Sequence, residues 1–319
     1  MIDCWTLKQV LFEYKFGMFK LFSIALKAIV FDTHFIKLLP SCGSLPTPPP
    51  PAAHTGDCAF ILGYPISKPL SRLSRIPSYL RYVPYQSHHY YISMQGSFNQ
   101  YLNKFNHKSR YNILRSVRLY QDFAQNKKPW KEYTRVDEME EFQRLARTVA
   151  IKTYQERLLG DGIPAGEIFL NQLKELASRD SIRCYILFLG SKPIAYLSCP
   201  VVHNTAVLYD YVGYDPDYRK WSPGTVLQYY TLKRLFEEER YEVFDFMRGG
   251  APDSHKKIFS SHDVLCADIY YFKYSVRNLA IIFFHVVIRT ASEWFTKFLD
   301  ILQIKFRLKR ILKEICTYS

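Results

Sequence analysis

The sequence predicts an α/β protein whose mixed, mostly antiparallel sheet is flanked by helices. Apolar residues recur at helical spacing between residues 97 and 180. Residues 182–214 instead hold three runs rich in β-branched and aromatic residues, broken at Gly190–Pro193 and at His203–Thr205. This pattern is typical of a three-stranded antiparallel meander. Helix and strand patterns then alternate to residue 275, which favours an α/β protein with a mixed sheet.

Local signals justify each element. Ser97 is a suitable N-cap for the first helix, and acidic residues open the helix at 137–156, as the helix dipole favours. In chain order we expect a short strand before Ser97, two helices up to residue 123, a strand at 128–136, helices at 137–156 and 166–180, the meander at 182–214, a helix from Ser222, a strand at 241–247, a short helix from about Pro252 and a strand at 267–275.

Composition shifts suggest four segments. Residues 1–38 form an amphipathic arm, which we interpret as an interfacial helix because lysines are scattered among its apolar residues. The four consecutive prolines within residues 39–57 favour an extended linker. Residues 58–275 form the main domain, and residues 276–319 form basic amphipathic helices.

Charge and cysteine usage narrow the class of protein. The net charge of +14 lies in the flanks, because acidic and basic residues nearly balance within residues 136–260. Basic flanks suit an anionic membrane surface or a polyanionic cofactor or substrate, and the sequence has neither the finger spacing nor the RNP-like strand of a nucleic-acid-binding protein. The seven cysteines show no CxxC pair and no metal-like cluster with histidine, which indicates reduced thiols in the cytoplasm and no metal site.

The C-terminal region leaves two interpretations open. Its longest apolar run, Asn278–Ile288, is shorter than a spanning helix and is bracketed by Arg277 and Arg289. Residues 291–315 combine apolar positions at helical spacing with lysines and arginines. They can pack against the main domain, or they can lie on an anionic membrane as a peripheral contact, for example at the inner membrane.

One helix start has the features of an anion site. Ser222 can be the N-cap and Pro223 the first helical residue, so the amides of Gly224 and Thr225 have no helical partner. Bare amides at the positive end of a helix dipole suit a phosphate or pyrophosphate. The alternative is an ordinary Ser-Pro helix start.

Four motifs in order resemble one family. They are "GSFNQYLNKFNHKSRYNILRSVR" from Gly96, "GSKPIAYLSC" from Gly190, "YDYVGYDPDYRKWSPGTVL" from Tyr209 and "FDFMRGGAPDSHKKIF" from Phe244. Together they resemble the GNAT acyltransferase superfamily, and within it the BioF2-like or CelD-like acetyltransferase domain, over residues 96–260. The resemblance implies the GNAT fold and the use of acetyl-CoA or another acyl-CoA as co-substrate.

The resemblance also implies where the cofactor would bind. The pantetheine arm would run along Val212, Gly213 and Tyr214, where the meander's last strand splays from its neighbour. The pyrophosphate would be held by residues around the helix start, namely Lys220, Ser222, Gly224 and Thr225. The sequence departs from the superfamily's "(Q/R)-x-x-G-x-(G/A)" signature because it has a single glycine there.

Acyl transfer needs groups that move a proton, which gives the catalytic candidates Asp210, Asp245 and His255. Asp210 could instead be a solvated strand residue, and His255 a surface helix residue, since the family usually has tyrosine at that position. Lys256 is a candidate anchor for an anionic substrate or for the cofactor. Arg110 and Arg115 could bind a phosphorylated or carboxylated acceptor, or they could be part of a solvated basic helix face.

These observations favour an acyl-CoA-dependent N-acyltransferase that acts on an amine of a polar metabolite or amino sugar, as in polysaccharide or cell-envelope biosynthesis. Two alternatives stay open. One is a non-catalytic GNAT-like protein that binds a partner or a membrane through its basic flanks. The other is a FemAB-like transferase that uses aminoacyl-tRNA and the same fold.

Overall fold

The computed structural model describes residues 5–17, 19–31, 47–50, 56–125, 128–153, 156, 162–248 and 255–301. The chain forms two units: unit 1 is residues 1–89 with 264–315, and unit 2 is residues 90–263 with 316–319. This division differs from the expected main domain, since residues 58–89 and 264–275 belong to unit 1. Most of the proline-rich linker lies outside the described residues.

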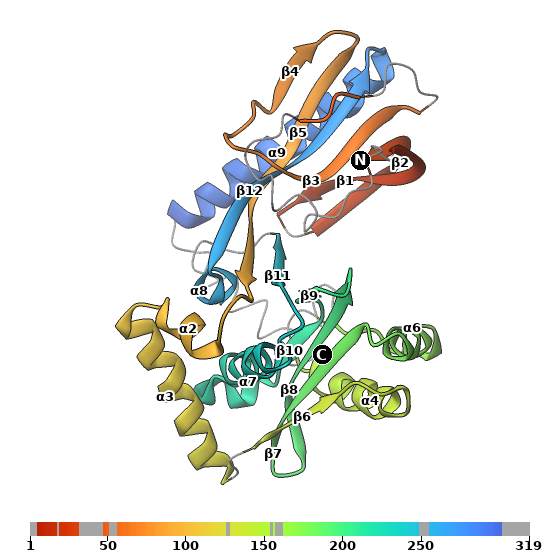
Figure 1. The fold of residues 1–319 in the computed structure, drawn as a ribbon. Helices are drawn as coiled ribbons and strands as arrows, with labels where there is room; N and C mark the ends of the chain where they lie inside the picture. The colour runs from red at the N-terminus through yellow and green to blue at the C-terminus, as the bar shows by residue number, and fades with distance from the viewer. Residues whose placement is uncertain are drawn as a thin grey trace. The chain divides into compact units, whose positions relative to one another are not determined.

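Unit 1 is a sheet with one long helix (Figure 1). The strand order is β1–β2–β3–β12–β5, and β4 pairs with β5. The elements are β1 (Trp5–Phe16), β2 (Phe19–Phe31), β3 (Cys58–Pro65), β4 (Leu73–Ile76), β5 (Tyr79–Ser93), β12 (His262–Lys273) and α9 (Val276–Ile301). Ile281 and Ile282 of α9 pack on aromatic residues of one sheet face, among them Phe12 and Tyr82.

The N-terminal arm is a β-hairpin, so the prediction of an interfacial helix is wrong for its described residues. Gly17 adopts a φ of 60° in the tight turn, where Phe16 pairs with Phe19. Phe12 and Tyr14 share one face of β1 and are buried, whereas Leu11, the residue before Phe12, is 55% exposed. This alternation has the period of a strand, and the parallel pairing of Ala28 with Cys58 joins the hairpin to β3.

The C-terminal segment is helical as expected, as far as it is described. The expectation that no segment is long and apolar enough to span a membrane needs correction, because Val276–Phe298 of α9 reaches that length with a mean hydropathy of 1.3. Residues 302–319 lie outside the described residues.

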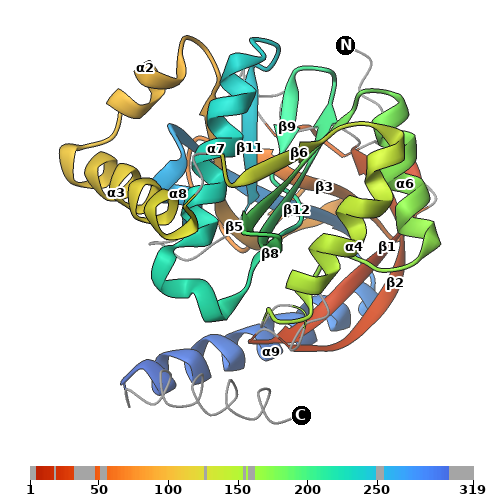
Figure 2. The same cartoon turned by 90° about the horizontal axis from the view of Figure 1, so that it is seen from below.

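Unit 2 places helices on both faces of its sheet (Figures 1 and 2). The strand order is β11–β9–β8–β7–β6, with β10 on β8, and every pair is antiparallel except β9 with β11. The strands are β6 (Trp130–Tyr133), β7 (Ile182–Leu189), β8 (Lys192–Val202), β9 (Ala206–Leu208), β10 (Val212–Tyr214) and β11 (Val243–Arg248). The mixed, mostly antiparallel sheet flanked by helices confirms the predicted fold class.

The helices of unit 2 pack on two apolar clusters. The first cluster lies under α2 (Phe98–Asn103), α3 (His107–Ala124) and α7 (Pro223–Glu237), and the second under α4 (Met139–Ala150) and α6 (Glu167–Ser178). Side chains of β7 alternate between them, since Tyr185 and Leu187 join the first and Cys184 and Ile186 the second. The short elements are η2 (Val136–Glu138), η3 (Pro216–Trp221) and α8 (His255–Phe259).

The meander forms where the sequence predicts it. Gly190 adopts a φ of 57° in the turn that closes β7 on β8, and His203 and Asn204 adopt φ values of 52° and 61° before β9. These left-handed residues make the turns tight. The third strand is split in two, into β9 and β10, and this split shapes the candidate site.

Candidate functional site

The candidate site begins where β9 and β10 diverge from β11. The backbone continues along β8 through the break, because Asp210 N donates to Ser198 O (3.2 Å) and Ser198 N donates to Tyr211 O (2.8 Å). On the other side, β11 pairs with β9 but not with β10, and the bond from Tyr209 N to Asp245 O (2.8 Å) is the last between β11 and this part of the chain. Among the described residues, β10 pairs with β8 alone, so its second edge is open.

The register decides which backbone groups face this open edge. Antiparallel strands alternate hydrogen-bonded and non-bonded pairs. Bonds from Ser198 N to Tyr211 O and from Asp215 N to Ile194 O place Gly213, midway between them, in a bonded pair with β8. Val212 and Tyr214 therefore direct their N–H and C=O groups outward. Of the three expected pantetheine contacts, the backbones of Val212 and Tyr214 are available and that of Gly213 is not.

Gly213 has a packing reason to be glycine. A Cβ at this position would lie 2.6 Å from Cε1 of Tyr196 on the neighbouring strand. The aromatic ring thus occupies the space that any other side chain would need. The glycine keeps β10 close to β8 and does not itself line the open edge.

The helix start has the expected arrangement with one difference. Ser222 is the N-cap of α7 and Pro223 its first residue, but Ser222 has a φ of 51° and its side chain makes no capping bond. The first helical bond runs from Val226 N to Ser222 O (3.1 Å), so the helix offers no acceptor to the amides of Gly224 and Thr225. A Cβ on Gly224 would lie 3.6 Å from the Tyr214 ring, which places the helix start beside the open edge of β10.

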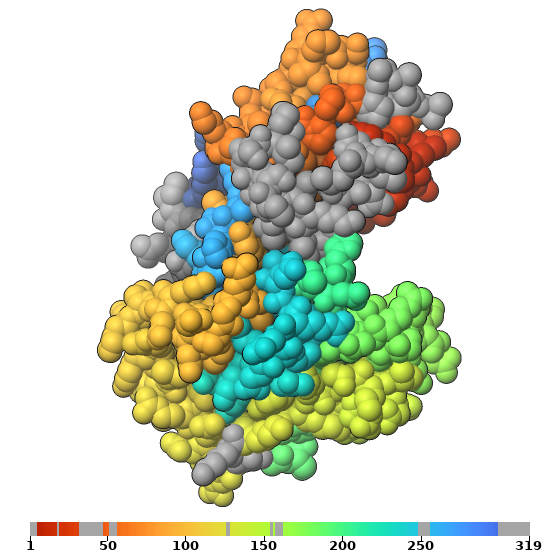
Figure 3. All heavy atoms as spheres, in the orientation of Figure 1, coloured from red at the N-terminus to blue at the C-terminus, as the bar shows by residue number. Residues whose placement is uncertain are grey.

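Stacked and charged side chains hold the loop before α7. Trp221 stacks on Phe123 of α3, with ring centroids 4.0 Å apart, and Lys220 Nζ lies 4.8 Å from the Trp221 ring. Asp215 is 1% exposed, and its Oδ2 accepts from Lys152 Nζ at 2.7 Å. In the space-filling view α3 and the residues around α7 pack side by side (Figure 3). Lys220 is thus held near the helix start, with its ammonium exposed.

Asp210 lies at the point of divergence, one residue after the last bond to β11. Its side chain is solvent-accessible, yet the surrounding protein desolvates the carboxylate and raises its pKa above 3.8. A carboxylate with a raised pKa is a better proton acceptor than an ordinary aspartate. Among the expected catalytic residues, Asp210 is the one that the structure places at the open edge.

Asp245 and Lys256 form a second, buried group. Asp245 is 2% exposed, and its Oδ1 accepts from Met247 N at 2.6 Å. Burial lowers the pKa of Lys256 below 10.5, and the nearby Asp245 carboxylate opposes this shift. This proximity favours a structural ion pair at the end of β11. His255 starts α8, but its side chain lies outside what the structure describes.

The two arginines are not brought to this edge by any described contact. Arg110 Nη1 donates to Asn103 Oδ1 at 2.6 Å, and Arg115 is exposed on the outer face of α3. Since Ile113 and Val117 form the buried face of that helix, the solvated basic face is the reading that the structure favours for Arg115.

Two buried polar residues of α7 were not predicted as site residues from the sequence. Gln228 is 3% exposed and Thr231 fully buried, and their polar side-chain atoms have no partner in the described part of the chain. Both lie on the Gly224 side of α7, four and seven residues further on, so polar residues at this spacing were the available signal. Buried unpartnered groups require an explanation, and a ligand or water between the helix and the sheet would supply one.

The open edge of β10 and the start of α7 together indicate the kind of ligand that the site can bind. An open backbone edge beside unpaired helical amides suits a ligand that has both amide groups and a phosphate. Residues 107–257 match the family model described as the acetyltransferase (GNAT) domain. The match covers just under half of the chain and identifies these residues as a GNAT-type acetyltransferase domain, as the motifs indicate, while the BioF2-like branch stays a prediction.

Several solved structures resemble the chain at low identity. A conserved protein of unknown function from Bacteroides thetaiotaomicron has 11% identity and a TM-score of 0.48, covering 68% of this chain and 70% of its own. FemX has 10% identity and a TM-score of 0.40, covering 59% and 61%. An aminoglycoside acetyltransferase from an uncultured soil sample, in complex with sisomicin, has 16% identity and a TM-score of 0.31, covering 41% and 84%. No curated protein matches the sequence.

Proposed function

We propose that unit 2 is an acyl-CoA-dependent N-acyltransferase. It would transfer an acyl group, acetyl in the simplest case, to an amine of a polar metabolite or amino sugar. The observation that carries this proposal is the open edge of β10 beside the unpaired amides of Gly224 and Thr225. The superfamily match over residues 107–257 supports it.

Each part of acyl-CoA has a candidate partner. The two amides of pantetheine can pair with the outward backbone groups of Val212 and Tyr214, as an added strand would. The pyrophosphate can accept from the amides of Gly224 and Thr225, at the positive end of the dipole of α7. Lys220 supplies a cation close to these amides.

Asp210 is the candidate base for the chemical step. The amine nitrogen bonds to the thioester carbonyl carbon, and its proton passes to the Asp210 carboxylate. An outward N–H of the strand edge can stabilise the oxyanion of the tetrahedral intermediate. The carbon–sulfur bond then breaks, the amide is released, and the CoA thiolate takes up a proton.

Binding of CoA is the first test. The melting temperature should rise with CoA, acetyl-CoA or a long-chain acyl-CoA, since a ligand at 100 times its Kd adds about 2.7 kcal/mol of stability. Gly224→Glu should weaken this effect by placing a carboxylate at the pyrophosphate position, whereas the isosteric Gly224→Gln should not do so to the same extent. No stabilisation of the wild-type chain by any of these thioesters or by CoA would contradict the proposal.

The role of Asp210 is tested separately. Asp210→Asn should lower kcat about 10²- to 10⁴-fold, while CoA still raises the melting temperature. The assay follows CoA release with a panel of amino sugars and polyamines. Wild-type activity retained in Asp210→Asn would remove the assigned base but leave the CoA site intact.

A further inference from the structure

The helix α9 turns two chemically different faces to its surroundings. Its inner face packs on the sheet of unit 1 through Ile281 and Ile282 and is also hydrogen-bonded to unit 1. Tyr14 Oη donates to Ile281 O (3.0 Å), the Tyr82 hydroxyl lies 2.6 Å from His285 Nδ1, and Gly17 N donates to Ser292 Oγ (2.7 Å). These contacts hold the helix flat along the sheet over most of its length.

The outer face of α9 is apolar and exposed. Val276 is 87% exposed, Phe283 62%, Trp294 73% and Phe298 56%, and these residues recur at helical spacing on one side. Residues 276–298 contain a single acidic residue, Glu293, which pairs with Arg72 at 3.0 Å and with Arg289 at 2.7 Å. Over residues 276–298 the outer face thus combines large apolar side chains with no acidic one, and the whole helix is about 39 Å long.

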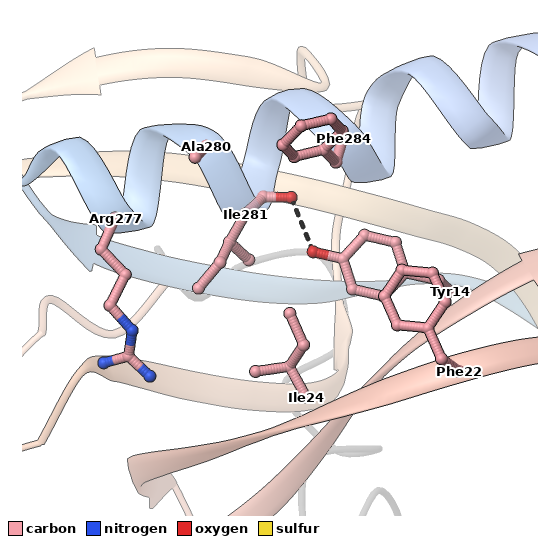
Figure 4. A pocket seen from close by; sticks show the side chains of 7 residues that line it. All are labelled: Tyr14, Phe22, Ile24, Arg277, Ala280, Ile281 and Phe284. Carbon is pink, nitrogen blue, oxygen red and sulfur yellow. Dashed lines mark hydrogen bonds between the residues drawn. The ribbon is translucent and has the colours of Figure 1, made fainter.

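The apolar surface continues onto the N-terminal hairpin. A hollow of about 290 Å³ lies between α9 and the strands β1 and β2. Figure 4 shows Phe284 above it, the stacked rings of Tyr14 and Phe22 at one side, and Arg277 at the other end. Phe284 is 57% exposed and Phe22 47%, so the hollow lies on an accessible apolar surface. Among the described residues that line it, Arg277 is the charged one.

We propose that the outer face of α9, with the adjoining hairpin edge at Phe22, binds the surface of an anionic lipid bilayer. The sequence that follows α9 supplies the charge, since residues 302–319 contain Lys305, Arg307, Lys309, Arg310 and Lys313 against the single acid Glu314. Apolar side chains that enter the interface and cations that meet anionic headgroups are the two components of peripheral membrane binding.

The same helix is a poor candidate for crossing the bilayer. Its length and mean hydropathy would allow it. However, crossing would detach His285 from Tyr82, Arg289 from the Tyr85 ring and Glu293 from Arg72. It would place these three polar side chains in hydrocarbon. Lying flat keeps those bonds and buries only the outer face.

Vesicle flotation of the full chain tests the proposal. The chain should float with vesicles of phosphatidylcholine containing 30% phosphatidylglycerol, and about tenfold less with pure phosphatidylcholine. The double variant Phe283→Ser/Trp294→Ser should lower the partition coefficient at least about tenfold. The matched control is Leu7→Ser/Leu11→Ser, because Leu7 and Leu11 are 60% and 55% exposed but lie on the hairpin face away from α9. That control should float as the wild type does.

A second readout keeps the test independent of folding. Trp294 fluorescence should shift to the blue and be quenched by brominated lipids, and Trp294→Phe should lose this signal while it retains flotation. A second copy of the chain is the competing occupant of the face. Concentration-dependent dimers in sedimentation velocity, abolished by Phe283→Ser/Trp294→Ser and accompanied by no vesicle binding, would overturn the proposal. CoA binding by unit 2 should be unchanged in every variant, so this proposal and the proposed function fail separately.

Discussion

The two units differ in how their helices cover the sheet. In unit 2, helices cover both faces of the sheet, and the enclosed polar groups include a charged pair, Arg183 with Glu238. In unit 1, α9 packs Ile281 and Ile282 on the sheet, bonds His285 to it, and turns an apolar face outward. Unit 2 thus encloses apolar side chains on both faces of its sheet, whereas unit 1 leaves an apolar helix face exposed.

Because of this difference, each unit has its own candidate binding surface. The open edge of β10 and the start of α7 belong to unit 2, and the apolar surface of α9 belongs to unit 1. Changes within one unit should therefore leave the function of the other intact. A substitution in one unit can be compared with the unchanged stability of the other unit in the same chain. Peptide-resolved hydrogen exchange in urea measures the stability of each unit separately.

The largest effect is expected at the buried ion pair of unit 2. Arg183 has a side chain that is 7% exposed, and its Nη2 lies 3.1 Å from Glu238 Oε2. Arg183→Met leaves the Glu238 carboxylate without this partner in a poorly solvated position, which should destabilise unit 2 by about 3–5 kcal/mol. Adding Glu238→Gln should recover a large part of the loss. If the single variant loses less than about 1 kcal/mol, the pair is not an important part of the interior.

Packing at Gly213 should give the next largest effect. Gly213→Ala pushes a methyl group against the Tyr196 ring, 2.6 Å away, and should destabilise unit 2 by up to about 3 kcal/mol. Gly224→Ala is the control, since its new Cβ meets the Tyr214 ring at an ordinary 3.6 Å and sits in a helix. That variant should be neutral or slightly stabilising. Equal losses in the two variants would show that β10 is not packed as described.

These two glycines also show how far the sequence could predict the site. The Ser-Pro-Gly start of α7 and the position of Asp210 follow from local patterns, because N-caps and strand periods involve neighbouring residues. Which of Val212, Gly213 and Tyr214 faces the open edge depends instead on the register with β8. The irregular residues 209–211 interrupt the two-residue alternation of the strand, so the sequence pattern alone does not predict this register.

In the fold, too, elements set by neighbouring residues were predictable, and elements set by pairing with distant strands were not. The meander was predictable because its turns at Gly190 and at His203–Asn204 bear the residues that left-handed backbone prefers. The hairpin β1–β2 was not, since its lysines and aromatic residues fit a helical period almost as well as a strand period. What favours the strand is pairing with β3, whose first residue, Cys58, lies 30 positions beyond its partner Ala28.

Acid should destabilise unit 1, whereas the substitutions at Arg183 and Gly213 destabilise unit 2. Burial and the nearby Arg289 lower the pKa of His285 from 6.5 to about 4. Between these values the unfolded chain takes up a proton that folded unit 1 does not, so the stability of unit 1 falls as the pH is lowered. About 2 kcal/mol should be lost between pH 8 and pH 5 from this histidine. His285→Asn removes the titrating group and should flatten this dependence in unit 1, and an unchanged slope would refute the assignment.

The smallest effect compares two helix starts within unit 2. Ser97 caps α2, because its Oγ accepts from Gln100 N at 3.2 Å, whereas Ser222 at the start of α7 makes no such bond. Ser97→Ala should therefore cost about 1 kcal/mol, and Ser222→Ala only a few tenths. Since Ser222 has a φ of 51°, Ser222→Gly relieves a left-handed backbone and should stabilise the start of α7 slightly. A loss from Ser222→Ala as large as that from Ser97→Ala would mean that the hydroxyl does cap α7 in solution, and the amides of Gly224 and Thr225 would then be less available to a phosphate.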